Sequence, residues 1–100
     1  MVEEPKVLCK TPTPGKKGTR ILKWKYDLIR STILAVVPSD EVGILFKDLP
    51  RLVQGLLTEA DLKRLGSLGW YTTTVKLDLE VRSEIERIPG VKPQRLRRSH

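Results

Sequence analysis

The sequence predicts an α+β domain of three to four helices, with a short strand after the first helix and a β-hairpin at the C-terminal end. Three observations lead to this prediction. Apolar residues recur at helical spacing up to residue 37, a branched apolar run follows at 42–46, and two short segments flank the proline- and glycine-containing stretch 89–93. With 100 residues, 39% of them hydrophobic, the chain is expected to build one modest core.

Residues 1–19 are predicted to form an extended basic arm, and residues 20–100 the folded domain. The arm contains Thr11-Pro12-Thr13-Pro14-Gly15, in which each proline fixes its own φ and disfavours the helical region for the residue before it. The polar run continues with Lys16-Lys17-Gly18. No helix is therefore expected before Thr19.

The first helix is expected to begin near Thr19, because threonine suits the N-cap position. One side of this helix is apolar at helical spacing: Tyr26, Ile29, Ile33, Val36 and Val37. Pro38 then ends the helix. The run Val42–Phe46 is too short for a helix and rich in branched apolar residues, so it is predicted to be a short strand.

Two short helices are predicted next. Asp48 is expected to cap the first of them, in whose opening turn Pro50 is tolerated. Thr58 and Asp61 have the spacing of a capping box, so another helix should begin there. It should end at Gly66, a residue suited to a left-handed C-cap.

Residues 72–82 fit two structures. Four apolar residues alternate with charged ones, which is typical of a half-buried strand: Val75, Leu77, Leu79 and Val81. Helical spacing is present too, since Val75 and Leu79 are four apart. The preceding threonines suit an N-cap, and the next segment already supplies a hairpin. We therefore predict a helix over residues 73–82.

The segment 84–98 is predicted to be a hairpin rather than a disordered tail. One register, in which paired residue numbers sum to 181, matches Ile85 with Leu96, Glu86 with Arg95, and Glu84 with Arg97. This register gives one face an apolar pair and the other two pairs of opposite charge. Each such pair contributes roughly 0.2–1 kcal/mol, and a disordered tail has no reason to show this agreement.

Basic residues are concentrated at both ends of the chain, whose net charge is +7. Residues 1–25 hold seven basic and two acidic residues, and residues 84–100 hold five basic and two acidic residues. The intervening residues 26–83 carry seven basic and eight acidic residues. This distribution predicts a polyanionic partner, with nucleic acid ahead of a membrane because no basic helix with a bulky apolar face accompanies the charge. The alternative is a charge that serves only solubility.

Several function classes are not expected. Cys9 is the only cysteine and His100 the only histidine, so an internal disulfide, a cysteine zinc cluster and a histidine triad cannot form. Cys9 is expected to be an inert thiol rather than a redox group. The carboxylate pairs lack a nearby nucleophile or phosphate loop, so neither an enzyme nor a cofactor is predicted. No apolar run approaches the ~18 residues of a membrane span, and the N-terminus has no signal-peptide core, which makes the cytoplasm the expected compartment.

The predicted order of elements resembles a winged helix-turn-helix domain. The resemblance extends from Ile44 to Arg98 and is carried by Phe46-Lys47-Asp48-Leu49, Thr74-Val75-x-x-x-Leu79 and Glu84-Ile85-Glu86-Arg87-Ile88-Pro89-Gly90. It implies that the helix before the hairpin enters the major groove and that the hairpin, the wing, contacts phosphates or the minor groove. Over nearly its full length, including Lys10-Thr11-Pro12-Thr13-Pro14-Gly15-Lys16 and Gly69-Trp70, the chain also resembles a family of bacterial proteins of similar size and unknown function.

The main hypothesis is therefore a module that binds duplex DNA, with transcriptional regulation as its expected role. The predicted contacts belong to the start of the helix, its length, the wing and the arm: Thr72, Thr73, Lys76, Arg82, Lys92, Arg95, Arg97, Arg98, Lys16, Lys17 and Arg20. Asp78 and Glu80 on the same helix would repel phosphate unless they point away or contact cytosine. The second hypothesis is a protein-interaction module that does not bind nucleic acid, and a homodimer fits either hypothesis.

Overall fold

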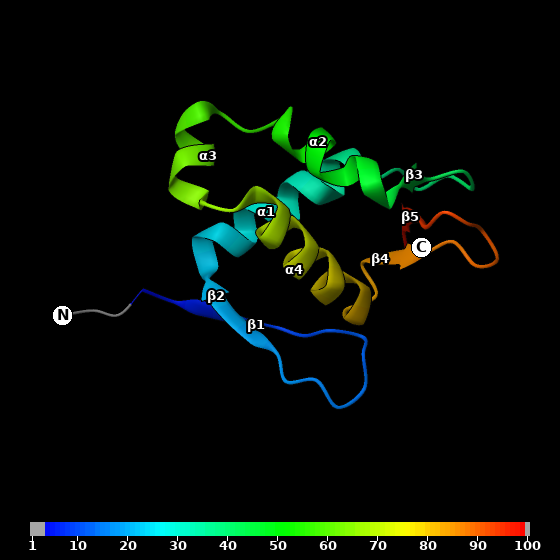
Figure 1. Cartoon of the computed structure of the whole chain (residues 1–100), viewed down its shortest axis with the longest axis horizontal. Coiled ribbons are helices and arrows are strands. Elements are labelled where there is room, and N and C mark those ends of the chain that lie inside the picture. The colour runs from blue at the N-terminus through cyan, green and yellow to red at the C-terminus, as the bar shows by residue number, and fades with distance from the viewer. Residues whose placement is uncertain (1–3, 100) are drawn as a thin grey trace.

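Two long helices meet at the centre of the molecule. The structure is a computed structural model that describes residues 4–99, with four α-helices and two small antiparallel sheets (Figure 1). In chain order the elements are β1 (Lys6–Cys9), β2 (Thr19–Leu22), α1 (Lys23–Val36), β3 (Ile44–Leu45), the 3₁₀ turn η1 (Phe46–Asp48), α2 (Leu49–Gln54), α3 (Glu59–Leu65), α4 (Leu68–Val81), β4 (Ile85–Arg87) and β5 (Arg95–Arg98). This arrangement confirms the α+β prediction. None of the helices within residues 4–99 is long and apolar enough to span a membrane.

The core lies between α1, α2 and α4 and continues onto the sheet of β3, β4 and β5. Its fully buried members come from every layer: Ile29, Ile33, Leu49, Val53, Leu65, Val75, Leu79, Ile85 and Leu96. Each buried aliphatic side chain of this size contributes about 1.5–3 kcal/mol relative to exposure. The two ends of the chain thus share one core with the helices.

The N-terminal segment forms a hairpin where an extended arm was expected. Strand β1 pairs with β2 so that Val7 lies opposite Ile21 and Cys9 opposite Thr19. This pairing buries Cys9 and Ile21, and it is the physical reason why residues 19–22 adopt an extended conformation. Helix α1 consequently begins at Lys23 instead of near Thr19 and has no side-chain cap.

The short helices follow their capping signals in part. The Thr58 side chain accepts a hydrogen bond from the Asp61 amide, and the Asp61 carboxylate accepts one from the Thr58 amide, which confirms the capping box of α3. Gly66 follows α3 with φ +93°, a conformation that glycine favours. Asp48 makes no capping bond, because it already belongs to η1.

The helical prediction for residues 73–82 is confirmed, but α4 begins five residues earlier, at Leu68. Ser67 caps it by accepting a hydrogen bond from the Trp70 amide at 3.3 Å. The threonines that were expected to cap the helix therefore lie within its second turn. Helix α4 is long enough to reach from α3 at one end to β4 at the other (Figure 1).

The predicted C-terminal hairpin is present, in a register different from the expected one. Residue numbers of the β4–β5 pairs sum to 183, so Glu86 faces Arg97 and Ile85 faces Arg98. A slip of two residues leaves every side chain on the same face, so the alternation of residue types does not distinguish the two registers. Strand β3 supplies the missing constraint, because Ile44 pairs with Leu96 and makes β5 the central strand.

The strand expected at Val42–Phe46 is reduced to Ile44–Leu45. The Asp40 carboxylate accepts hydrogen bonds from the amides of Val42 and Gly43, at 3.1 and 2.7 Å, and this turns the chain just before β3. Gly43 has φ +65°, and a Cβ atom there would lie 2.2 Å from the Leu96 carbonyl oxygen. Glycine therefore allows β3 to approach β5 closely.

Candidate nucleic-acid interface

We call the hairpin formed by β1 and β2 the N-terminal hairpin (residues 5–22). All of its charged residues are basic. Its five cations have exposed side chains, and no acidic residue lies between Pro5 and Leu22: Lys6, Lys10, Lys16, Lys17 and Arg20. Strand alternation explains this surface. Val7, Cys9 and Ile21 face the core, while Lys6, Leu8 and Arg20 face solvent. The predicted contacts Lys16, Lys17 and Arg20 are therefore accessible, although they lie on a folded hairpin rather than an arm.

The hairpin formed by β4 and β5, here called the C-terminal hairpin (residues 84–99), also has an excess of basic residues. Lys92 is exposed in its connecting loop and Arg98 is exposed on β5. The Nε atoms of Arg95 and Arg98 donate to the carbonyl oxygens of Val42 and Val37, at 2.8 and 2.9 Å. These bonds hold the two guanidinium groups at defined positions and leave their terminal nitrogens available.

Two other arginines of the C-terminal hairpin are matched to carboxylates. Arg97 Nε lies 3.4 Å from Glu86 Oε1, and Arg87 Nε donates to Glu80 Oε1 at 2.8 Å. Arg97 is half-buried, so its predicted phosphate contact competes with Glu86. Arg87 was not among the predicted contacts, yet its side chain is about half exposed.

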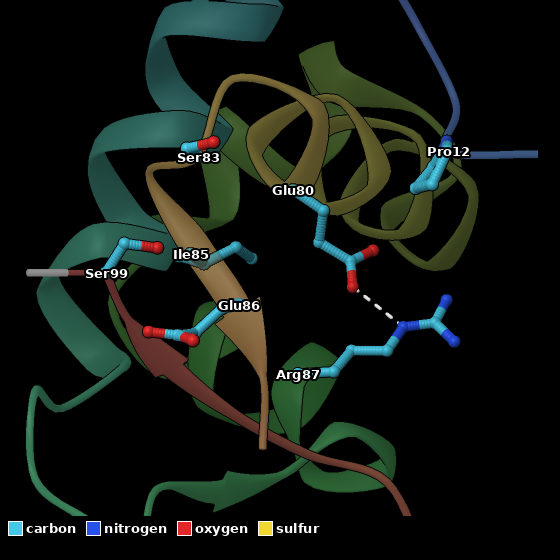
Figure 2. A pocket seen from close by; sticks show the side chains of 7 residues that line it. All are labelled: Pro12, Glu80, Ser83, Ile85, Glu86, Arg87 and Ser99. Carbon is cyan, nitrogen blue, oxygen red and sulfur yellow. Dashed lines mark hydrogen bonds and ion pairs between the residues drawn. The ribbon is translucent and has the colours of Figure 1, made fainter. Parts of the chain in front are cut away.

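A groove separates the two hairpins. It is lined by the Pro12 ring from the N-terminal hairpin and by residues at the end of α4 and on the C-terminal hairpin: Glu80, Ser83, Ile85, Glu86, Arg87 and Ser99 (Figure 2). Pro12 lies across this groove from Ser83 and Ser99, and Arg87 extends along one side toward Glu80. Segments about 70 residues apart in sequence thus border the same groove.

A buried carboxylate fixes the N-terminal hairpin in place. Asp78, on α4, is only 1% exposed and accepts three hydrogen bonds. The donors are the Lys10 amide at 2.9 Å, the Tyr26 hydroxyl at 2.6 Å and Arg82 Nε at 2.6 Å. Burial and the bond to Asp78 raise the pKa of Tyr26 well above its usual value. Asp78 therefore joins the N-terminal hairpin, α1 and α4 in one polar cluster, which we call the Asp78 cluster.

Lys76 was predicted to contact DNA, and the structure buries it instead. Its side chain is 1% exposed, with Nζ 2.7 Å from Gln94 Oε1, 3.0 Å from Glu80 Oε2 and 4.4 Å from the centre of the Phe46 ring. Removal from water lowers the pKa of Lys76, and the carboxylate of Glu80 opposes that shift. The lysine connects α4 to the C-terminal hairpin and is unable to reach a phosphate.

The remaining predicted contacts on α4 also change. Thr72 is fully buried, and its hydroxyl has no hydrogen-bond partner among residues 4–99. Thr73 is half-buried in the second turn and does not lie at the helix start. Arg82 is about half exposed, but its Nε is held by Asp78, whose carboxylate raises the pKa of Arg82. Of these residues, only Arg82 offers a cation to solvent.

The sequence contains a pattern that indicates the N-terminal hairpin, but the many polar and proline residues between its two strands favoured the interpretation as an arm. Two short apolar runs, Val7-Leu8-Cys9 and Ile21-Leu22, flank a polar stretch with Pro14-Gly15 near its middle. A hairpin prediction from this pattern would have added Lys6 and Lys10 to the candidate cations. The Asp78 cluster had no comparable signal, because its three donors lie on three different elements.

The Cys9 thiol is protected by its place in the hairpin. The side chain is 3% exposed, and burial, together with the nearby Asp78 charge, raises the pKa of Cys9 to about 11. Near pH 8 we expect Cys9 to react with an aromatic disulfide reagent about a hundredfold more slowly than an unhindered cysteine, from thiolate fraction alone. Reaction of the native protein followed by absorbance, with the urea-unfolded chain as the control, measures this. Equal native and unfolded rates would contradict a docked hairpin.

Comparisons with known proteins place the chain in a family without assigning it an activity. A search of curated proteins and a search of solved structures each gave no match. One family model does match, over residues 6–96. The matched segment begins at the first residue of β1, includes all four helices and reaches into β5. The chain therefore belongs to the family of unknown function DUF6958.

Proposed function

We propose that the protein binds the phosphate backbone of duplex DNA with its two basic hairpins. The observation that supports this proposal is that both hairpins border one groove, the N-terminal hairpin with Pro12 and the C-terminal hairpin with Glu86 and Arg87, while each hairpin also carries an excess of basic residues. The N-terminal hairpin contributes five basic residues and no acidic ones, and the C-terminal hairpin contributes five basic and two acidic residues. Clustered cations on two projecting elements suit a regularly spaced polyanion.

We further propose that the domain is winged-helix-like, with β4 and β5 as the wing. The order helix, strand, helices and hairpin supports this, as does the confirmed helix in front of the hairpin. Asp78 and Glu80, which would have repelled phosphate on an exposed helix, are buried and matched by cations. These two carboxylates therefore repel a bound phosphate backbone less than exposed ones would.

The proposed binding does not read base sequence through α4. All three charged residues of the helix are directed inward, with side-chain exposures of 1% for Lys76, 1% for Asp78 and 8% for Glu80. Specific readout needs side-chain donors and acceptors that reach base edges. Contacts with phosphates alone position a protein without selecting a sequence. A role in covering or organising DNA therefore fits this surface better than the selection of one operator.

A salt titration tests the proposal. If about six phosphates are neutralised, the logarithm of the affinity for a labelled duplex should fall against the logarithm of salt concentration with a slope near −5. Fluorescence anisotropy with duplex, single-stranded DNA and RNA side by side gives the preferred form. We expect unrelated duplexes to bind with affinities within about threefold of one another. A flat salt response would exclude binding through these cations.

A matched pair of double variants locates the contact. Lys16→Gln/Lys17→Gln removes two exposed cations from the N-terminal hairpin, and Lys47→Gln/Lys63→Gln removes two exposed cations from η1 and α3. The first variant should make the salt slope shallower by about 2, at roughly one per lost contact, while the second leaves the slope unchanged. If both variants changed the salt slope equally, DNA binding would depend on the net charge of the protein and not on the N-terminal hairpin.

A further inference from the structure

The outer face of α4 is an apolar stripe that the proposed DNA contact does not use. Its members follow the spacing i, i+4, i+7 and i+11 and therefore share one side of the helix: Trp70, Thr74, Leu77 and Val81. Trp70 is 47% exposed and Val81 is 41% exposed. Thr74 and Leu77 between them are half-buried. At 1.5 Å per residue the stripe extends for about 16 Å.

Helix α4 departs from the usual arrangement of a surface helix, in which the charged residues face water. Its apolar residues Val75 and Leu79 face the core as expected, but its charged residues face inward as well. Its only charged residues are Lys76, Asp78 and Glu80, and all three are buried. Exposed single apolar residues are common, but a contiguous stripe on a helix whose charges all point inward is not. Such a face is suited to contact with another apolar surface.

From the Trp70 end of this stripe, a series of aromatic and cationic contacts continues through Tyr71 and Lys25 to Trp24 and Arg64. The rings of Trp70 and Tyr71 are in edge-to-face contact, with centroids 4.9 Å apart. Lys25 Nζ lies 4.7 Å from the Tyr71 ring centre, and the Arg64 guanidinium lies 4.5 Å from that of Trp24. Aromatic residues and arginine are the types enriched at the centres of protein interfaces.

The two cations beside these rings lack an acidic partner. Lys25 Nζ donates to the Leu65 carbonyl oxygen at 2.9 Å and to the Tyr71 hydroxyl at 3.1 Å. Within residues 4–99, no carboxylate forms an ion pair with Lys25 or Arg64. The stripe thus ends in positive charge that a bound partner is able to complement.

We propose that the stripe Trp70–Thr74–Leu77–Val81 docks an amphipathic segment of a partner protein, with acidic residues next to its apolar face. The uncharged stripe favours protein over nucleic acid, because a polyanion gains no ion pair along it. The net charge of +7 disfavours a second copy, because two such chains repel each other. An amphipathic acidic segment would cover the stripe with its apolar face, as amphipathic helices do in apolar grooves, and would place carboxylates near Lys25 and Arg64. The stripe lies outside the proposed phosphate contacts, so a DNA titration and a peptide titration succeed or fail separately.

Selection from a library of random displayed peptides on the full chain tests this proposal. The enriched peptides should carry apolar residues at helical spacing together with Asp or Glu. A labelled consensus peptide should then bind wild-type protein in an anisotropy titration, and Val81→Asp should weaken binding at least about tenfold. Val42→Asp is the matched control, because Val42 is also exposed, at 63%, but lies before β3. Trp70→Ser repeats the test at the other end of the stripe should Val81→Asp not fold.

A charge exchange tests the choice of an acidic partner. Arg64→Glu should weaken the consensus peptide about tenfold, and replacing the acidic residues of the peptide with lysine should restore binding to this variant. Lys47→Glu, at an exposed lysine of η1, should have no effect. Enriched peptides without acidic residues, or unchanged binding to both stripe variants, would overturn the proposal. A dimer in light scattering that Val81→Asp dissociates would overturn it as well, in favour of a second copy.

Discussion

Replacing Asp78 with alanine should lower the free energy of unfolding by about 3–5 kcal/mol, because the carboxylate is buried and satisfies three donors at once. Its loss leaves the Tyr26 hydroxyl, the Lys10 amide and Arg82 Nε without that acceptor. Small domains are stable by only about 5–15 kcal/mol, so the variant should be near its folding limit. Urea unfolding followed by circular dichroism measures the change.

One comparison controls for a general loss of negative charge, and a second tests whether Asp78 holds the hairpin in place. Asp27→Ala removes an exposed carboxylate whose partner is Lys23 four residues earlier, and it should cost no more than about 0.5 kcal/mol. Asp78→Asn keeps the size of the side chain and should accelerate thiol labelling of Cys9, because the hairpin loses its charged anchor and the thiol loses a charge that raises its pKa. Labelling at the wild-type rate would show that Asp78 does not hold the hairpin.

Replacing Glu80 with alanine should cost about 3 kcal/mol near neutral pH, because it leaves the ammonium of Lys76 buried beside an amide and an aromatic ring. Glu80 also accepts from Arg87, so the change removes one of the side-chain contacts between α4 and the C-terminal hairpin. Glu41→Ala, at an exposed residue before β3, is the control and should be close to neutral. If Glu80→Ala and Glu41→Ala lowered the free energy of unfolding equally, the prediction would be wrong.

The cost of Glu80→Ala should decrease as the pH rises. Burial already lowers the pKa of Lys76 below the ordinary value of 10.5, and removal of the Glu80 charge lowers it further. Between the folded pKa and 10.5 the unfolded chain binds more protons than the folded one, so the stability of the variant increases with pH relative to wild type. Adding Lys76→Met should abolish this relative increase. Urea unfolding at several pH values, with wild type measured in parallel, checks the sign.

Local patterns were sufficient to predict most of the helices and the presence of the C-terminal hairpin. The capping box at Thr58 and Asp61 and the apolar spacing of α1 act within one element, so the sequence displays them directly. The ambiguity over residues 72–82 had a physical cause. Alternating charges usually mean exposure, whereas here Lys76, Asp78 and Glu80 are buried with partners from other parts of the chain.

The wrong predictions concern contacts between distant segments. The register of β4 and β5 depends on β3, the extended form of Thr19–Leu22 depends on β1, and the burial of Lys76 depends on Gln94. None of these partners lies within the range over which local propensity acts. The candidate surface changed in part for the same reason, since Lys76 is bound by the distant Gln94, whereas Arg82 is held by Asp78 of the same helix. Five of the cations predicted at the two ends, by contrast, are exposed: Lys16, Lys17, Arg20, Lys92 and Arg98.

The bond between the Lys10 amide and Asp78 spans 68 positions of the chain. During synthesis Lys10 leaves the ribosome long before its acceptor exists, so the nascent N-terminal hairpin has no helix on which to settle. Its basic surface is then accessible to ribosomal RNA and other polyanions at the exit site. The hairpin is able to dock only after α4 has been made, so docking of the earliest segment is a late event in folding.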